Sequence, residues 1–106
     1  MGSEEAMIRI RHYTNDKGIT GIRLDGVIKA QDKGRVFAEA ANKKPGAPRD
    51  VENKYGIKRG HGKNYVETDV EAIRVEAHWN ERMQAVELRV RGDIVLKNEN
   101  FVIRKH

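Results

Sequence analysis

The sequence predicts an α+β domain in which two short amino-terminal helices pack on a mainly antiparallel, twisted β-sheet. Two observations support this prediction. Apolar residues recur at helical spacing in two glycine-ended segments of the first half, and they alternate with polar residues from residue 64 onward. A chain of 106 residues has the length of one domain. We therefore expect a single domain over residues 8–106, with residues 1–7 as a linker, an artificial start or a cut point.

The chain begins with a predicted strand and a predicted helix. Apolar and charged residues alternate over residues 8–12, with the period of two expected of a half-buried strand. Asn15 or Asp16 can cap a helix that holds two isoleucines one turn apart, and Gly26 can end it in the left-handed conformation. Two glycines inside this helix each weaken it by roughly 1 kcal/mol, so packing must stabilise it.

The remainder of the first half alternates short extended pieces with a second helix. Residues 27–28 and 36–38 are apolar and read as short strands. Two prolines in residues 42–48 break regular structure and predict a loop. The second of these prolines suits the first turn of a helix over residues 49–55, and Gly56 can end that helix.

The second half of the chain is rich in predicted strands. Apolar residues alternate with polar ones over residues 66–70, 73–79 and 86–90. The polar segment 80–84 turns the chain, so the second and third of these strands form a hairpin. Two further strands complete the sheet, at residues 94–96 and 101–103.

The net charge of +5 lies in one segment, which we call the basic window, residues 43–63. The basic window holds seven Lys or Arg and two acidic residues, and the rest of the chain sums to zero. Concentrated positive charge with interleaved aromatic residues is typical of a surface that faces a polyanion, although a solvated loop–helix–loop explains it as well. The candidate nucleic-acid or partner-binding residues are Lys54, Lys58, Arg59, His61 and Lys63.

Composition also excludes several classes of chemistry. The chain has no cysteine, which excludes disulfides, thiolate chemistry and a cysteine-based zinc site. Its four histidines lack a spacing such as HExxH, so we expect no metal. Its only serine is Ser3, whose terminal position argues against a Ser-His-Asp hydrolase. No apolar run approaches the roughly 18 residues that span a membrane.

The triplet His12-Tyr13-Thr14 stands between the first strand and the first helix. A ring nitrogen can bond a ribose hydroxyl, a phenol can stack on a base, and a helix N-terminus favours phosphate. These groups are what a nucleotide pocket needs. The alternative interpretation is a histidine at the edge of the core, with its ring nitrogens bonded to the backbone.

Two further segments carry groups capable of chemistry. Glu87 faces away from Val86 and Leu88, which is typical either of a surface charge or of a carboxylate in a site. In the segment GHGKNY, residues 60–65, two glycines allow a close approach of the backbone, and His61 and Lys63 offer an acid–base group and a cation. This segment matches neither the P-loop nor the dinucleotide fingerprint.

The stretch HYTNDKGITGIRLDGVIKA, residues 12–30, resembles the start of small ADP-ribosyltransferase toxin domains that are named for a His-Tyr-Asp signature. These domains are C-terminal toxin modules of bacterial polymorphic, Rhs or contact-dependent inhibition proteins. Residues 36–70 resemble the middle of such a module, and the resemblance spans residues 8–96. The segment ELRVRGD, residues 87–93, is similar to the strand that carries the catalytic glutamate in many ADP-ribosyltransferases.

The resemblance implies NAD as the substrate and a reaction without metal. His12 would orient the nicotinamide ribose, Glu87 would stabilise an oxocarbenium-like transition state, and Tyr65 would stack on the substrate. The catalytic candidates are therefore His12, Tyr13, Thr14, Tyr65 and Glu87, and the NAD-binding candidates are His12, Tyr13, Thr14 and Phe37.

The chain departs from the family pattern at two positions. Phe37 stands where the family often has a tyrosine, and no second glutamate precedes Glu87 at a spacing of two. Asp69 is the second candidate for the acidic member of the signature.

Two other functions fit the same residues. A metal-independent ribonuclease toxin of the barnase, EndoU, colicin or RelE type would cleave tRNA or rRNA with a general base, a general acid and a cation. A non-catalytic nucleic-acid-binding module would explain the charge but not the triplet. The ribonuclease candidates are His12, Arg59, His61, Lys63 and Glu87.

The toxin resemblance also implies a setting and partners. We expect a monomeric domain within a secreted or surface-delivered bacterial protein, which acts in the cytoplasm of the target cell. The producing cell then needs an inhibitor, and the charge of the basic window predicts an acidic immunity protein. The same charge suggests RNA or an acidic protein as the target.

Overall fold

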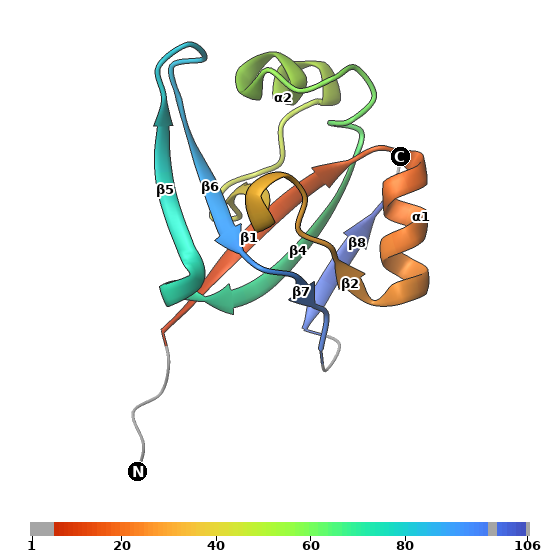
Figure 1. Cartoon of the computed structure of the whole chain (residues 1–106). Helices are drawn as coiled ribbons and strands as arrows, with labels where there is room; N and C mark the ends of the chain where they lie inside the picture. The colour runs from red at the N-terminus through yellow and green to blue at the C-terminus, as the bar shows by residue number, and fades with distance from the viewer. Residues whose placement is uncertain (1–5, 98–99, 106) are drawn as a thin grey trace.

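The computed structural model describes residues 6–97 and 100–105 (Figure 1). In this part of the chain the elements follow the predicted order, with two α-helices among the strands. The helices are α1 (Asp16–Asp25) and α2 (Pro48–Tyr55), and two short 3₁₀ segments are η1 (Asp32–Gly34) and η2 (Ala72–Arg74). The strands are β1 (Met7–Thr14), β2 (Val27–Ile28), β3 (Arg35–Ala40), β4 (Asn64–Glu71), β5 (Val75–Asn80), β6 (Ala85–Arg91), β7 (Ile94–Val95) and β8 (Phe101–Arg104).

The main sheet has six antiparallel strands in the order β5-β6-β3-β1-β4-β8, and β2 pairs with β7 in a second, two-stranded sheet. The predicted α+β class is confirmed. The sequence pattern places the sheet mainly in the second half of the chain, whereas β1 and β3 from the first half form its centre. The reason is the long β1–β4 ladder, which pairs every residue of β1 from Met7 to Thr14 with β4.

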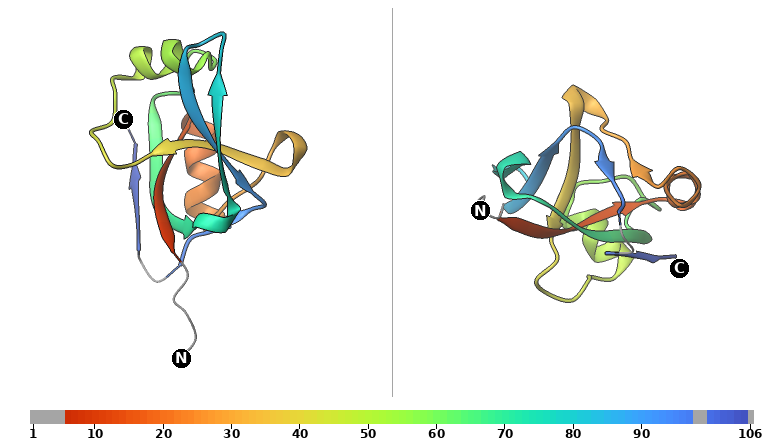
Figure 2. Two further views of the ribbon diagram at one scale, coloured as in Figure 1. Left: turned by 90° about the vertical axis from the view of Figure 1, so that its left-hand side faces the viewer. Right: turned by 90° about the horizontal axis from the view of Figure 1, so that it is seen from below.

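The core lies between the main sheet, α1 and the β2–β7 pair, which close one side of the sheet in Figure 2. Helix α1 begins as predicted, because the side chain of Asn15 accepts a hydrogen bond from the N–H of Gly18 at 2.8 Å. It ends at Gly26, whose φ of 67° lies in the left-handed region. Its inner face contributes Ile19 and Ile22 to a core that also holds Ile10, Ile28, Val36, Val66, Val70, Val90 and Ile94.

The β5–β6 hairpin differs from its predicted form. Residues 72–74 form η2, so β5 begins at Val75, and Ile73 is 76% exposed. The cross-strand pair Trp79 and Val86, which stands at apolar positions of the alternating pattern, is also about half exposed. The cause is that β3 pairs with β6 only as far as Leu88, so the outer part of the hairpin extends past the sheet beside α2 (Figures 1 and 2).

A buried polar cluster, which we call the Glu39 cluster, joins β1, β3, β4 and α2. Arg11, which is 2% exposed, pairs with Glu39 at 2.5 Å and with Glu67 at 2.8 Å. The hydroxyls of Tyr13 and Tyr55 donate to the two oxygens of Glu39 at 2.7 and 2.6 Å. Each buried charge in the cluster therefore has partners, as burial requires.

The cluster fixes the charge of its members. Burial alone would raise the pKa of Glu39, but the bonds from Tyr55, Tyr13 and Arg11 outweigh it and hold the pKa below its ordinary value. Burial alone would lower the pKa of Arg11, and its bonds to Glu39 and Glu67 outweigh that effect and raise the pKa. Burial and the bond to Glu39 raise the pKa of both tyrosines, so their hydroxyls stay protonated.

Replacing Glu39 should therefore destabilise the fold. Glu39→Gln leaves Arg11 buried with one carboxylate partner fewer, and we expect the free energy of unfolding to fall by about 3 kcal/mol. The control is Glu76→Gln, which breaks the exposed Arg35–Glu76 pair and should cost under about 1 kcal/mol. Urea denaturation of the three proteins measures both changes.

The stability difference between the wild type and Glu39→Gln should also depend on pH. The folded-state pKa of Glu39 lies below its ordinary value of 4.5, so the carboxylate stabilises the fold above that pH. This stabilisation is lost as the pH falls through the folded-state pKa. The stability difference between wild type and Glu39→Gln should shrink below pH 4.5, and a constant difference would contradict the assignment.

Candidate active site

The site begins where β1 and β3 separate. Their ladder ends at the pair Arg11 and Glu39, and beyond it the ring of His12 bridges the strands, with Nδ1 at 2.8 Å from the carbonyl oxygen of Phe37. A carbonyl accepts only, so Nδ1 carries the proton and Nε2 of the neutral ring is an acceptor. Burial lowers the pKa of His12, and the Phe37 carbonyl only partly opposes this effect, so the ring is neutral at pH 7.

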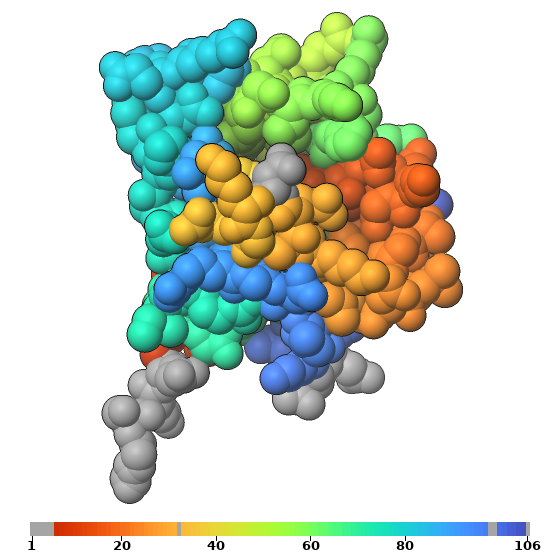
Figure 3. Space-filling view, in the orientation of Figure 1, coloured from red at the N-terminus to blue at the C-terminus, as the bar shows by residue number. Residues whose placement is uncertain are grey.

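Two adjoining cavities open beside this separation, and together we call them the cleft. The first has a volume of about 340 Å³ and lies between β1, β3, β6 and α2. The second has a volume of about 660 Å³ and runs along the start of α1 to β2. His12, Tyr13 and His61 line both cavities. In Figure 3 the β5–β6 hairpin, α2 and α1 border the η1 segment on one face of the molecule.

The first cavity brings together candidates from distant parts of the sequence. His12, Tyr13, Phe37, His61 and Glu87 all line it. Phe37 is 41% exposed, and the guanidinium of Arg89 lies 5.5 Å from the centre of its ring. Thr14 lines the second cavity, next to the start of α1. The predicted triplet thus borders a cleft, and the His12 ring also has the backbone bond that the alternative interpretation, a histidine at the edge of the core, predicts.

Glu87 is held in place by the neighbouring strand. The side-chain amide of Asn80 donates to its Oε1 at 2.8 Å, and the side-chain oxygen of Asn80 accepts from the N–H of Met83 at 3.1 Å. The hairpin turn fixes Asn80, and Asn80 in turn fixes the carboxylate of Glu87 at the part of the cavity wall that β6 forms. The prediction that Glu87 faces away from Leu88 is confirmed, and that face borders the cleft.

Two of the predicted site residues, Tyr65 and Asp69, lie outside the cleft. The ring of Tyr65 packs edge-on against Tyr13 with centroids 6.0 Å apart, under the guanidinium of Arg11, and it is not among the residues that line the cleft. Asp69 pairs with Arg9 at 3.2 Å and accepts from Asn100 at 2.6 Å.

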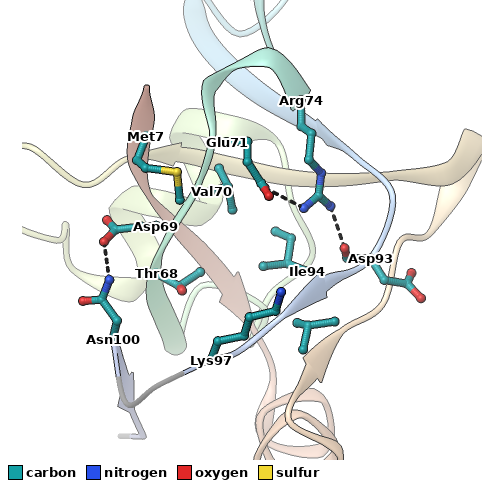
Figure 4. A pocket seen from close by; sticks show the side chains of 11 residues that line it. Met7, Thr68, Asp69, Val70, Glu71, Arg74, Asp93, Ile94, Lys97 and Asn100 are labelled. Carbon is teal, nitrogen blue, oxygen red and sulfur yellow. Dashed lines mark hydrogen bonds and ion pairs between the residues drawn. The ribbon is translucent and has the colours of Figure 1, made fainter. Parts of the chain in front are cut away.

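The cavity that Asp69 lines is a separate one of about 330 Å³ (Figure 4). Arg74 occupies its far wall, where it donates to Glu71 and to the backbone carbonyl of Asp93. The structure therefore removes Asp69 from the cleft and leaves Glu87 as the carboxylate candidate there.

The basic window covers α2 and the loops on either side of it. His61 is the member of the predicted binding set that lines the cleft. Lys63 pairs with Asp16 at 3.1 Å, at the start of α1. The ammonium of Lys54 lies 5.2 Å from the ring centre of Tyr55, and the neighbouring Lys43 together with burial lowers the pKa of Lys54. Lys58 and Arg59 are exposed.

Sequence reasoning missed three polar residues of the first cavity: Glu39, Tyr55 and Asn80. Tyr55 was visible only as an aromatic residue on the face of a helix, and Asn80 only as a turn residue. Glu39 gave no signal, because its partners Arg11 and Tyr13 are remote in the sequence.

The sequence matches one family model, described as HYD1 signature containing ADP-ribosyltransferase, over residues 10–98. The match covers most of the chain, so the chain belongs to this family of ADP-ribosyltransferase toxin domains. The resemblance that residues 12–30 suggest is thereby confirmed. No curated protein and no solved structure matches the chain.

Two features are absent from the residues that the structure describes. No group of three or more His, Cys, Asp or Glu side chains is placed to hold a metal ion in that part of the chain. No helix in it is long and apolar enough to cross a membrane.

The contact between Thr14 and α1 predicts opposite effects for two glycines. A Cβ at Gly21 meets no atom within 4 Å, so Gly21→Ala should stabilise the fold by about 1 kcal/mol through helix propensity. A Cβ at Gly18 would lie 2.0 Å from Oγ1 of Thr14, so Gly18→Ala should lose this gain or destabilise. Thermal melts of both variants measure the difference, and equal stabilisation would show that Thr14 does not pack on α1.

Proposed function

We propose that this domain transfers ADP-ribose from NAD to a macromolecule in a competitor cell. The proposal builds on the family and on one observation about charge. Two carboxylates line the first cavity, and Glu39 is paired with Arg11. Glu87 accepts from the neutral amide of Asn80 and forms no ion pair within the described part of the chain. Glu87 thus brings an uncompensated negative charge to the cavity.

An uncompensated carboxylate suits the reaction. When the glycosidic C–N bond of NAD breaks, the electron pair leaves with nicotinamide and positive charge develops on the ribose. A fixed negative charge stabilises that cation where it forms. A nucleophile of the target then bonds to the ribose carbon and loses its proton to solvent or to a nearby base.

The other cleft residues would bind the dinucleotide. Nε2 of His12 would accept from a ribose hydroxyl, and the exposed ring of Phe37 would stack against the nicotinamide. Lys17 and the N-terminus of α1 line the second cavity and would place positive charge near the phosphates.

RNA cleavage is the second candidate function. The observation that favours it is that His12, His61 and Glu87 line one cavity, because metal-independent cleavage at a 2′-hydroxyl needs a general base and a general acid. This reaction would leave RNA fragments with 2′,3′-cyclic ends.

One experiment distinguishes these functions. The protein is incubated with labelled NAD in a cell extract and, separately, with total RNA. Release of nicotinamide with label on a macromolecule supports the transferase, and cyclic-ended fragments with intact NAD support the ribonuclease. RNA that is bound but not cleaved, with NAD intact, supports the binding module.

The charge of Glu87 should be essential to NAD consumption. Glu87→Gln keeps the shape and the bond from Asn80 but removes the charge, so we expect turnover to fall roughly 100-fold or more. Stability should change by less than about 0.5 kcal/mol, because the side chain is only partly buried. The control is Glu81→Gln, an exposed residue of the hairpin turn, which should keep full turnover. An active Glu87→Gln variant would contradict the mechanism.

We also propose that the basic window binds the acidic immunity protein and guides an acidic target. Six of the seven cations of the window are exposed and make no ion pair within the described residues, and three of the six belong to the predicted binding set: Lys54, Lys58 and Arg59. Lys63 is not counted with these cations, because it already forms an ion pair with Asp16. The window adjoins the cleft through Tyr55 and His61, so a partner bound there would cover the entrance.

Replacing Lys54, Lys58 and Arg59 together with Gln should weaken polyanion binding. We expect association with labelled polyglutamate and with labelled RNA to slow about tenfold at low salt and to lose much of its salt dependence. The matched control replaces Arg23, Arg104 and Lys105, which are exposed and lie outside the window, for the same change in net charge. Equal effects of the two triple variants would show that net charge alone acts.

A further inference from the structure

The loop that carries His61 is fastened to α2 by one carboxylate. Oε2 of Glu52 accepts from the N–H of Gly60 at 2.9 Å and from the N–H of Gly62 at 3.0 Å, and Glu52 is 9% exposed. A Cβ at Gly62 would lie 2.7 Å from the carbonyl oxygen of Pro48. This close packing holds His61, which stands between the two glycines, at a fixed place.

That place is the boundary between the two cavities, since His61 lines both. A ligand that extends from the first cavity to the second must pass this boundary. If the reacting ribose of a dinucleotide lies beside Glu87 in the first cavity, the middle of the dinucleotide lies at the boundary between the two cavities. The middle of NAD is its pyrophosphate, which carries negative charge and accepts hydrogen bonds.

The neighbouring Asn15 determines which ring nitrogen of His61 can donate. Its side-chain oxygen accepts from the N–H of Gly18 as the cap of α1, so the orientation of the amide is fixed. Its Nδ2 therefore faces Nε2 of His61, at 3.3 Å. An amide N–H needs an acceptor, so Nε2 is unprotonated and the proton of the neutral ring sits on Nδ1.

We infer that His61 binds the pyrophosphate of NAD by donating a hydrogen bond from Nδ1–H, an inference that rests on the proposed function. Asn15 and Glu52 are positioning residues in this arrangement: Asn15 sets the tautomer, and Glu52 holds the loop. His12 and His61 then complement each other. His12 offers an acceptor at Nε2 to a ribose hydroxyl, and His61 offers a donor at Nδ1 to a phosphate oxygen.

The tautomer is tested on the free protein by NMR of the histidine ring nitrogens. In the wild type, Nε2 of His61 should give the signal of an unprotonated nitrogen, and Nδ1 that of a protonated one. Asn15→Asp keeps the helix cap but turns a carboxylate oxygen toward Nε2, which should then become protonated. The exposed His78 is the reference, and its signals should not change. A wild-type His61 protonated at Nε2 would overturn the inference.

Binding is tested by steady-state kinetics with NAD. A bond made equally to the substrate and to the transition state lowers KM without affecting kcat, so His61→Ala should raise KM about tenfold and leave kcat within about twofold. His61→Asn places an amide N–H near the position of Nδ1 and should recover part of the loss. An unchanged KM, or a loss confined to kcat, would overturn the inference.

The role of Glu52 is tested by a conservative pair of variants. Glu52→Gln keeps an oxygen that can accept from Gly60 and Gly62, so KM should stay near the wild-type value. Glu52→Ala removes the acceptor, and KM should rise as in His61→Ala, with thermal melts confirming that both variants fold. A kcat loss at unchanged KM in Glu52→Ala would overturn the positioning role.

These outcomes separate the inference from the function on which it rests. If the wild-type protein consumes no NAD, the proposed function fails, and the NMR result still reports the bond between Asn15 and His61. If the wild type consumes NAD and His61→Ala has the wild-type KM, the inference alone fails.

Discussion

The Glu39 carboxylate is the interaction on which the architecture of the cleft depends. It holds Arg11 and Tyr13 of β1 and Tyr55 of α2 from its place on β3. Without it, the buried Arg11 and the partly buried Tyr13 and Tyr55 would each lose a partner, and each unsatisfied group costs free energy. The cleft wall formed by Tyr13, Glu39 and Tyr55 is therefore a by-product of the packing that joins α2 to the sheet.

The cleft itself results from a limit on strand pairing. β1 pairs with β4 along its whole length but with β3 only up to Arg11, so the two halves of the sheet diverge at His12. The ring of His12 bonds to the Phe37 carbonyl, which would otherwise lack a ladder partner from β1. A histidine at this position thus satisfies the backbone and also supplies a functional group, which unites the two interpretations of the triplet.

Sequence patterns predicted local structure well and long-range contacts poorly. The cap at Asn15, the stop at Gly26 and the hairpin around residues 80–84 depend on neighbouring residues, and all three are present. The central position of β1 and the role of Glu39 depend on partners remote in the sequence, which periodicity does not reveal. Residue chemistry and the family resemblance pointed to His12 and Glu87, and both line the cleft, whereas no pattern linked Asn15 to His61.

The neutral state of His12 has a consequence for Glu87. A protonated imidazole beside the ribose would offset the field of the carboxylate and weaken its attraction for a developing cation. Burial and the Phe37 carbonyl keep His12 neutral with an acceptor at Nε2, and the side-chain amide of Asn15 faces Nε2 of His61. Glu39 contributes no free negative charge, because Arg11 compensates it. In the proposed function, the one uncompensated carboxylate of the first cavity, that of Glu87, would then act on the reacting bond without an opposing charge from His12.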